Sequence, residues 1–424
     1  MTTINPDLLL FNALPVQTDI LASKEIDYHP RAGDNTGPLE FIIAGTGDDY
    51  IDLNKIDINI KFKILKADGS AIAAADKVGI NNLGIATIFR DVTLHVANKQ
   101  IEGGQMDYAY KSYFRAMTQF HPSAQATHLK GFGWYKDEAG KFDDETNKGF
   151  IARQKLIEGS KVCELHGPVF LDFFNQSRPL INNVDVRLIF TIQKPEFFLN
   201  SFKPTPCKIE IVDATLYARR LTMNPSVIKG HMDGLSSHNA IYPVNHTELQ
   251  KFSIGTGKMT FTRDQLFNGK NPRLVMIAMT TDKAQDGNYE RNPFNFRHFN
   301  LSEITLRVGG NSVPGPSYQP DFAAGHYLRS YNNFMEALKF YNTDDTNGIS
   351  PSEYPEGYFI NVFDLTPDND ISSAHRHANM NKNMRLDLSF KTPTTETLIV
   401  HVYAVYDQQV EITKIRDVLP DYMN

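Results

Sequence analysis

Two histidines separated by one residue, His375 and His377, are the side chains whose type and spacing first suggest chemistry. Imidazole nitrogens are common ligands of zinc, and alternate residues of a strand lie on one face. Asp368 and Asp370 precede them in a polar turn, but no cysteine and no third histidine is near in the sequence. The spacing leaves a metal site open, and a solvated loop without a metal is the interpretation we favour.

Paired carboxylates occur at Asp143 and Asp144, and again at Asp344 and Asp345. Two carboxyl groups that face each other across a cleft, about 5 to 10 Å apart, can hydrolyse a glycosidic bond. Both pairs lie in polar segments, where acidic residues commonly keep a loop soluble. We therefore prefer the interpretation that these carboxylates are surface charges.

The stretch SIGTGKMTF at residues 253–261 resembles the end of a phosphate-binding loop. It lacks two parts of that motif, because Phe252 stands where the first glycine belongs and Met259 where a serine or threonine would bind magnesium. A plain hairpin turn is the simpler interpretation. The chain also lacks a GxSxG elbow, an HExxH helix and a CxxC pair. We predict that the protein is not an enzyme and has no catalytic residue, cofactor or metal.

The composition indicates a globular protein, since 41% of the 424 residues are hydrophobic and 22% are charged. A formal net charge of −6 would repel a phosphate backbone, so direct sequence-specific binding of nucleic acid is not expected. The two cysteines, Cys163 and Cys207, are expected to be small buried side chains in a reducing compartment. We expect neither a signal peptide nor a transmembrane segment, because no apolar stretch is long enough.

Alternation of apolar and polar residues predicts strands in most of the chain. The clearest example is YIDLNKIDINIKFKI at residues 50–64, where a break between Leu53 and Ile56 suggests a bulge. Many strands of about 6 to 10 residues, separated by turns, favour antiparallel sandwiches over a parallel sheet. The predicted class is all-β, with two tandem jelly-roll sandwiches, short inserted helices and long loops. This arrangement is a double jelly roll.

A duplication supports the prediction of two domains. DVTLHV at residues 91–96 precedes an aromatic helix expected near 106–118, and EITLRV at 303–308 precedes another near 322–339. Aligning Val92 with Ile304 gives an offset of 304 − 92 = 212, which is half of the 424 residues. The predicted divisions are an N-terminal arm at 1–38, a first jelly roll at 39–222, a linker at 223–240 and a second jelly roll at 241–424.

Two groups of apolar side chains are predicted to contact other subunits. An apolar run in the arm would pack either on a neighbour or on its own domain. The aromatic faces of the two helices would pack on a sheet of their own chain, against a neighbouring subunit or around a ligand. The predicted interface residues are Leu8, Leu9, Leu10, Phe11, Tyr113, Phe114, Tyr331 and Phe334. The long polar segment around Trp134 is expected to project from the surface.

With these strands in place, the chain resembles the double jelly-roll major capsid proteins of DNA viruses, especially those of Polinton/Maverick elements and adintovirus-like viruses. The resemblance rests on packing patterns rather than catalytic motifs, and it covers most of the chain apart from the arm and the long loops. The stretches that carry it lie at 50–64, 147–190, 208–227, 357–368 and 398–418.

The resemblance implies a structural protein of the virion. Three subunits would form a pseudo-hexagonal capsomer, or hexon, and such capsomers would tile an icosahedral capsid. Its partners would be the other subunits of the homotrimer, neighbouring capsomers, and penton and minor capsid proteins. The protein would be made in soluble form in the cytoplasm or nucleus of the host cell. Two alternatives are a carbohydrate-binding or carbohydrate-active β-sandwich protein and a minor spike or receptor-binding protein.

Overall fold

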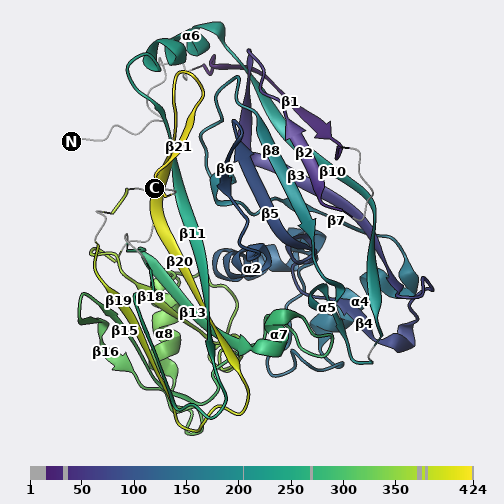
Figure 1. Cartoon of the computed structure of the whole chain (residues 1–424), viewed down its shortest axis with the longest axis vertical. Coiled ribbons are helices and arrows are strands. Elements are labelled where there is room, and N and C mark those ends of the chain that lie inside the picture. The colour runs from purple at the N-terminus through teal and green to yellow at the C-terminus, as the bar shows by residue number, and fades with distance from the viewer. Residues whose placement is uncertain are drawn as a thin grey trace, which may run out of the picture.

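The computed structural model places the two halves of the chain side by side. It describes residues 16–31, 37–203, 205–267, 271–369, 375–377 and 381–422. Figure 1 shows the strands of the N-terminal half, in purple to teal, beside those of the C-terminal half, in green to yellow. Helix α2 (Tyr108–Gln119) lies between the two sets of strands.

The N-terminal half contains two sheets of four antiparallel strands among its described residues. The first has the order β1-β10-β3-β7, formed by Ile20–Tyr28, Cys207–Met223, Asp49–Lys66 and Cys163–Pro168. The second has the order β2-β8-β5-β6, formed by Leu39–Ile43, Val186–Ile192, Phe89–Val96 and Lys99–Glu102. A short pair, β4 (Val78–Ile80) and β9 (Leu199–Ser201), lies outside both sheets.

The C-terminal half is built in the same way. One sheet has the order β11-β20-β13-β18, formed by Ala240–Ile254, Leu398–Ile412, Leu274–Thr281 and Ile360–Asp364. The other has the order β12-β19-β15-β16, formed by Thr260–Asp264, Met384–Phe390, Leu301–Val308 and Asn311–Tyr318. The short strand β21 (Val418–Pro420) pairs with β20, and β14 (Phe296–Arg297) pairs with β17 (Glu356–Gly357).

The strand order is identical in the two halves. If the principal strands described in each half are counted along the chain, one sheet joins the first, eighth, third and sixth, and the other joins the second, seventh, fourth and fifth. Two facing sheets of this order make a jelly roll. The predicted duplication of an all-β domain is therefore confirmed, and DVTLHV and EITLRV belong to the fourth strand of each roll, β5 and β15.

Strand β3 shows how the sequence produces these sheets. From Ile56 to Ile64 every second side chain is buried in the core, and the side chains between them are only partly buried. The register with β10 shifts between Ile56, which pairs with Ala218, and Asp52, which pairs with Arg219. The predicted break before Ile56 is therefore a bulge, which bends the strand without moving its apolar face out of the core.

The prediction of an arm at residues 1–38 was wrong for residues 20–28. These residues form β1, the first strand of the first roll, which pairs with β10 from Ile20 opposite Met223 to Tyr28 opposite Leu216. The strand lies at the edge of its sheet and most of its side chains are exposed. An exposed edge strand needs no apolar alternation, so the sequence gives little sign of it.

Helix α6 (Pro225–Gly234) occupies most of the expected linker and joins the last strand of the first roll to the first strand of the second (Figure 1). Asn224 caps the helix through its side-chain oxygen, which accepts a hydrogen bond from the backbone N–H of Ser226. Pro225 follows in the first helical position, where proline is well tolerated. We propose the boundary between the two domains at this helix.

The other helices are short insertions between strands. Helix α2 follows the fifth strand of the first roll, and α8 (Leu328–Ala337) follows the fifth strand of the second, as predicted from the aromatic pattern. The remaining α-helices are α1 (Gly84–Thr87), α3 (Pro122–Ala126), α4 (Lys148–Ile157), α5 (Pro195–Phe198) and α7 (Asp282–Asp286). Within the described residues, no helix is both long and apolar enough to cross a membrane.

Candidate functional site

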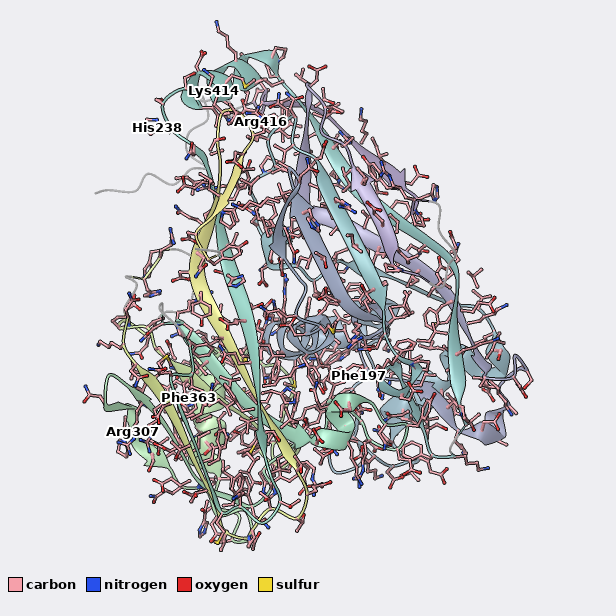
Figure 2. The ribbon with its side chains drawn as sticks, viewed as in Figure 1. Phe197, His238, Arg307, Phe363, Lys414 and Arg416 are labelled. Carbon is pink, nitrogen blue, oxygen red and sulfur yellow. The ribbon has the colours of Figure 1, made fainter. Side chains whose placement is uncertain are left out.

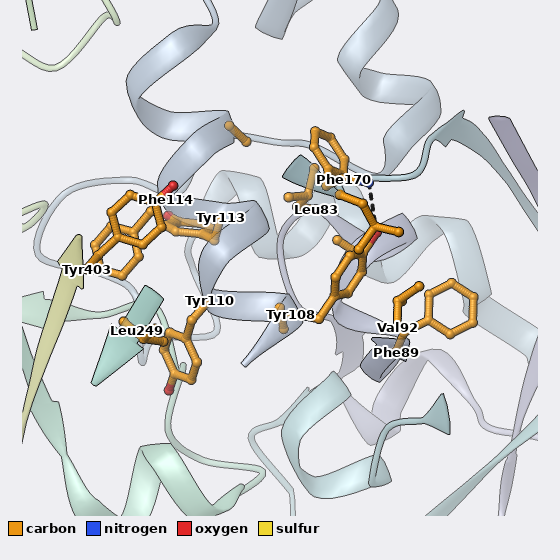
Figure 3. Packing of buried hydrophobic residues seen from close by; sticks show 14 of the residues in the cluster. Leu83, Phe89, Val92, Tyr108, Tyr110, Tyr113, Phe114, Phe170, Leu249 and Tyr403 are labelled. Atoms are coloured by element: carbon orange, nitrogen blue, oxygen red, sulfur yellow. Dashed lines mark hydrogen bonds between the residues drawn. The ribbon is translucent and has the colours of Figure 1, made fainter. Parts of the chain in front are cut away.

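The most elaborate site in the molecule is the junction between the two rolls, and α2 forms its centre. The helix belongs to the first roll, but its aromatic face meets the second. The ring of Tyr113 stacks on Phe294 at 4.0 Å between centroids, with 6° between the ring planes. The ring of Phe114 stacks on Phe296 at 5.2 Å and on Tyr403 of β20 at 5.3 Å. Figure 3 shows Phe114 and Tyr403 lying against each other.

Tyr113 and Phe114 are both 0% exposed within the single chain. The prediction that they contact another subunit is therefore corrected, because neither side chain has any exposed surface that a second subunit could contact. They join two domains of the same chain instead. The sequence alone could not distinguish the two cases, since an aromatic helix face looks the same whichever surface covers it.

Helix α8 is the counterpart of α2 in the second roll. Phe334 is fully buried and its ring lies 5.6 Å from that of Tyr354, so it belongs to the core and not to a subunit contact. Tyr331 is only partly buried and donates a hydrogen bond from its hydroxyl to the carbonyl of Ile349 at 3.0 Å. A subunit contact at Tyr331 stays a prediction. The other predicted contacts, Leu8, Leu9, Leu10 and Phe11, lie outside the described residues.

Buried charges also connect the rolls. Asp172 of the first roll accepts hydrogen bonds from the backbone N–H of Thr247 at 2.7 Å and from its hydroxyl at 2.8 Å, and Thr247 lies on β11 of the second roll. Glu102 accepts hydrogen bonds from the backbone N–H groups of Asp172 and Phe173. Burial, and then the nearby charge of Asp172, raises the pKa of Glu102 to about 8. This shift favours the neutral, protonated form of Glu102.

His246 extends this polar cluster on the second roll. Its ring stacks on Tyr422 at 4.2 Å, with 11° between the planes, and its Nδ1 lies 3.9 Å from Oδ2 of Asp172. Burial lowers the pKa of His246 to about 4, although Asp172 opposes this effect. The imidazole is consequently neutral at pH 7 and packs as an aromatic ring. Nothing in this arrangement presents a reactive group to a substrate.

Residues 134–147, which we call the strap, were expected to project into solvent, and this was wrong. Trp134 is buried, and its ring centroid lies 5.4 Å from that of Tyr113. Phe142 is buried against Tyr358 of the second roll. Lys136 forms an ion pair with Glu353 at 2.7 Å. The strap thus crosses the junction. Its many glycine, aspartate and lysine residues made it look like an exposed loop in the sequence, although Trp134 and Phe142 anchor it.

An ion pair without solvent exposure fixes the strap to the first roll. Nη2 of Arg153 lies 2.7 Å from Oδ1 of Asp137, and both side chains are 0% exposed. Arg153 also donates hydrogen bonds to the carbonyls of Ile80 and Tyr135. From the second roll, the hydroxyl of Tyr358 donates a hydrogen bond to the carbonyl of Asp137. Because one side chain of α4 bonds β4 and two residues of the strap, Arg153 fixes the strap to the first roll.

Contacts at the far end of the junction lie below α6, where Figure 2 labels Lys414 and Arg416. These two residues follow β20 of the second roll. Arg416 donates hydrogen bonds to the carbonyl oxygen of Asn182 at 2.8 Å and to its side-chain oxygen at 2.7 Å, and Asn182 belongs to the first roll. Lys414 donates a hydrogen bond to the hydroxyl of Ser236. The rolls are therefore joined along their length.

The carboxylates of the two acidic pairs either accept local hydrogen bonds or face solvent. Asp143 accepts hydrogen bonds from the backbone N–H of Asn292 and the side-chain amide of Asn295, which again connects the strap to the second roll. Asp144 accepts a hydrogen bond from the backbone N–H of Thr146 within a turn. Asp344 and Asp345 are exposed. Asp143 and Asp144 also line a cavity of about 480 Å³ together with Glu356, but the hydrogen bonds of Asp143 give it a structural role there.

The turn at residues 255–259 is not a hairpin, although we expected one. It connects β11 to β12, which belong to different sheets of the second roll. The backbone N–H of Gly257 donates a hydrogen bond to the carbonyl of Thr394, and that of Lys258 to the hydroxyl of Thr394. The backbone groups that a phosphate would need are therefore used by the loop before β20.

The histidines lie in a loop between β18 and β19 rather than on a strand. Nε2 of His375 is 2.9 Å from Oδ2 of Asp368, and Nε2 of His377 is 3.1 Å from Oδ1 of the same residue. Nδ1 of His377 lies 2.9 Å from Oδ2 of Asp407 on β20. The fold thus gathers two histidines around one carboxylate, which the sequence spacing only suggested.

Comparisons with known proteins agree on the architecture. No family model matches the chain. A chain of the Sputnik virophage superimposes with a TM-score of 0.65 at 12% identity, covering 99% of this chain and 92% of the virophage chain. The mavirus major capsid protein gives a TM-score of 0.55 at 10% identity, covering 99% and 93%. This chain has the double jelly-roll fold of viral major capsid proteins.

One further solved structure and one sequence relative extend the likeness. The Faustovirus major capsid protein gives a TM-score of 0.55 at 7% identity, covering 94% of this chain and 91% of its own. An uncharacterised protein of Caenorhabditis elegans is 24% identical over 401 residues, which cover 91% of this chain and 93% of the worm protein. The predicted resemblance to double jelly-roll capsid proteins is confirmed at the level of the fold.

Proposed function

We propose that this protein is the major structural subunit of an icosahedral capsid. It would assemble as a homotrimer into pseudo-hexagonal capsomers and would be located in the virion. The observation that carries this proposal is the pairing of two rolls of identical strand order in one chain through a buried junction. The proposal needs no catalytic group and no cofactor.

The geometry of a tile explains why such a junction matters. Three chains of two similar rolls present six similar units around one axis, and this ring can pack hexagonally only if the two rolls of each chain keep a fixed orientation. Stacked rings, buried hydrogen bonds and the strap all restrict that orientation. Assembly into hexagonal capsomers therefore requires a junction that fixes the two rolls of each chain relative to each other.

Surfaces for assembly remain at the edges of the sheets and on α8. Among the described residues, strand β1 lies at one edge of its sheet, and sheet edges invite pairing unless a neighbour covers them. Near Tyr331, Leu328 is 54% exposed and Tyr341 is 55% exposed, which supports a contact between subunits there. Penton and minor capsid proteins as partners rest on the family resemblance alone.

The carbohydrate alternative was motivated by aromatic residues at the surface and by abundant acidic residues, and the structure supports neither feature as a sugar site. Its aromatic residues would have to face solvent, but Trp134, Tyr113 and Phe114 are buried in the junction. Its carboxylates would have to be free to act in a cleft, and although Asp143 and Asp144 line a cavity of about 480 Å³, Asp143 already accepts hydrogen bonds from Asn292 and Asn295. We therefore propose assembly rather than sugar binding as the activity of this protein.

Light scattering on the purified protein tests the proposal. Each chain has a mass of 47.9 kDa, so a trimer has a mass of 3 × 47.9 = 143.7 kDa. We expect this mass at micromolar concentration and neutral pH, together with hexagonal particles in electron micrographs. A chain that stays monomeric at all these concentrations and forms no tiles would refute the proposal, and binding in a glycan screen would favour the alternative.

A further inference from the structure

The loop between β18 and β19 contains a cluster of metal-binding side chains that the assembly function does not use. Asp368, His375 and His377 each offer one ligand atom, and these atoms all lie within 4.8 Å of one another. The rings of the two histidines have centroids 4.7 Å apart and are inclined by 57°. Both Nε2 atoms therefore point towards the same carboxylate.

The spacing of these atoms is close to what a tetrahedral ion requires. Ligands that lie about 2.0 to 2.1 Å from zinc are about 3.3 Å from one another in a tetrahedral arrangement. Nε2 of His375 lies 2.9 Å from Oδ2 of Asp368 and Nε2 of His377 lies 3.1 Å from Oδ1, so each nitrogen is within about 0.5 Å of that spacing from one of the two carboxylate oxygens. A small outward movement of the side chains would admit an ion.

The surroundings of His377 also resemble those of a metal ligand. Its Nδ1 lies 2.9 Å from Oδ2 of Asp407, and its backbone N–H donates a hydrogen bond to the same oxygen at 3.0 Å. The other oxygen of Asp407 is 3.0 Å from Nη1 of Arg273. Metal-binding histidines usually have their second nitrogen fixed by a carboxylate in this way, which directs Nε2 at the ion.

We propose that Asp368, His375 and His377 bind one divalent transition-metal ion, with zinc as the chemically favoured example, and that Asp407 positions His377. Two imidazoles and one carboxylate suit zinc, whereas calcium and magnesium prefer a shell of oxygen ligands. Three protein ligands leave one position for water. His377 lines a cavity of about 410 Å³, which has room for that water.

Such an ion would connect the loop to the sheet. Asp368 lies shortly after β18, His377 lies shortly before β19, and Asp407 belongs to β20. The ion would link Asp368 to His375 and His377, and the contact of His377 with Asp407 would connect the ion to the eighth strand of the second roll. Each subunit would contain one such site, so the proposal does not depend on the oligomeric state.

Titration of zinc alone into chelator-treated full-length protein, followed by calorimetry at neutral pH, tests this site. We expect one ion per chain, with binding at least 100-fold weaker in His375→Ala and in His377→Ala. His238→Ala is the matched control, because His238 is an exposed histidine near α6 (Figure 2) whose ring contacts Ser237, and its variant should bind as the original chain does. Cobalt in place of zinc should give the absorption spectrum of a four-coordinate site.

Asp407→Asn separates the positioning role from direct binding. The variant should still bind one ion per chain and keep the cobalt spectrum, but about 10- to 100-fold more weakly. His375 is about half exposed, so His375→Ala can be made without disturbing the core. The cluster would be only a set of ion pairs if no stoichiometric binding occurred, or if His375→Ala and His377→Ala bound zinc as tightly as His238→Ala. Either result would overturn the proposal.

Discussion

Replacement of Phe114 by alanine should weaken the junction between the rolls. The ring is 0% exposed and stacks on both Phe296 and Tyr403 of the second roll. Truncation of a buried phenylalanine costs about 3 to 5 kcal/mol, and the two ring contacts account for about 1 to 3 kcal/mol of this loss. At a urea m-value of about 3 kcal/mol/M, the unfolding midpoint should fall by about 1 to 2 M.

Trp134 supplies the assay, because it is the only tryptophan in the sequence and its ring lies 5.4 Å from that of Tyr113 at the junction. Urea unfolding followed by tryptophan fluorescence therefore reports on the junction itself. All variants should be compared at one protein concentration, since assembly stabilises the folded chain in a concentration-dependent way. Phe190→Ala is the matched control, because Phe190 is equally buried and its ring packs against the rings of Phe41 and Phe89 within its own roll.

A double-mutant cycle with Tyr403→Ala then isolates the contact between rolls. Phe114→Ala and Tyr403→Ala should show a coupling energy of about 0.5 to 1.5 kcal/mol, as expected of an aromatic pair. Phe190→Ala and Tyr403→Ala share no contact and should be additive within about 0.5 kcal/mol. If the first pair were also additive, Phe114 would not join the rolls energetically, and our account of the junction would fail.

Three further predictions concern the strap, the buried carboxylate and the outer helix. Asp137→Asn should cost about 3 to 5 kcal/mol of unfolding free energy in urea, because it leaves Arg153 charged and buried, whereas Asp144→Asn in an exposed turn should cost less than about 1 kcal/mol. Because the pKa of Glu102 is raised in the folded protein, its contribution to the free energy of unfolding is complete below about pH 4.5 and is lost as the pH rises through about 8. Glu102→Gln should therefore flatten the fall in stability over that pH range. An unchanged slope would contradict the assignment. Tyr331→Ala should lower the trimer fraction in light scattering, whereas Tyr331→Phe, which keeps the ring, should not; equal trimer fractions would remove Tyr331 from the interface.

The double jelly roll could be predicted because strands such as β3 bury one face and leave the other partly exposed, which produces alternating apolar and polar residues. In β3 the apolar side chains alternate with polar ones, and even the bulge before Ile56 is visible as a break in that alternation. The order of strands and the helix after the fifth strand recur in both halves, so a partial repeat was enough to predict two similar domains. Edge strand β1 was not predicted as a strand, because its exposed side chains need not alternate between apolar and polar residues.

The junction could not be predicted in the same way. Tyr113 and Phe114 were recognised as a packing face, but the surface that covers them comes from Phe294, Phe296 and Tyr403, which are distant in the sequence. The strap was misjudged because polar residues surround its buried anchors, Trp134 and Phe142. The residues around His377 were also ambiguous, since Asp407 approaches it only through the pairing of β20 within its sheet.

The contrast between α2 and α8 indicates how one fold provides both a permanent and an exchangeable contact. The stretches KSYF at 111–114 and RSYN at 329–332 each contain a buried serine, and matching Ser112 with Ser330 aligns Tyr113 with Tyr331 and Phe114 with Asn332. In a pseudo-sixfold trimer, the contact from roll to roll within a chain recurs from the second roll to the first roll of the next chain. Our proposed function therefore assigns α8 the position between subunits that α2 occupies between rolls. The exchange of a buried phenylalanine for an exposed asparagine makes this outer contact more polar, as expected of a surface that must be soluble before assembly and covered after it.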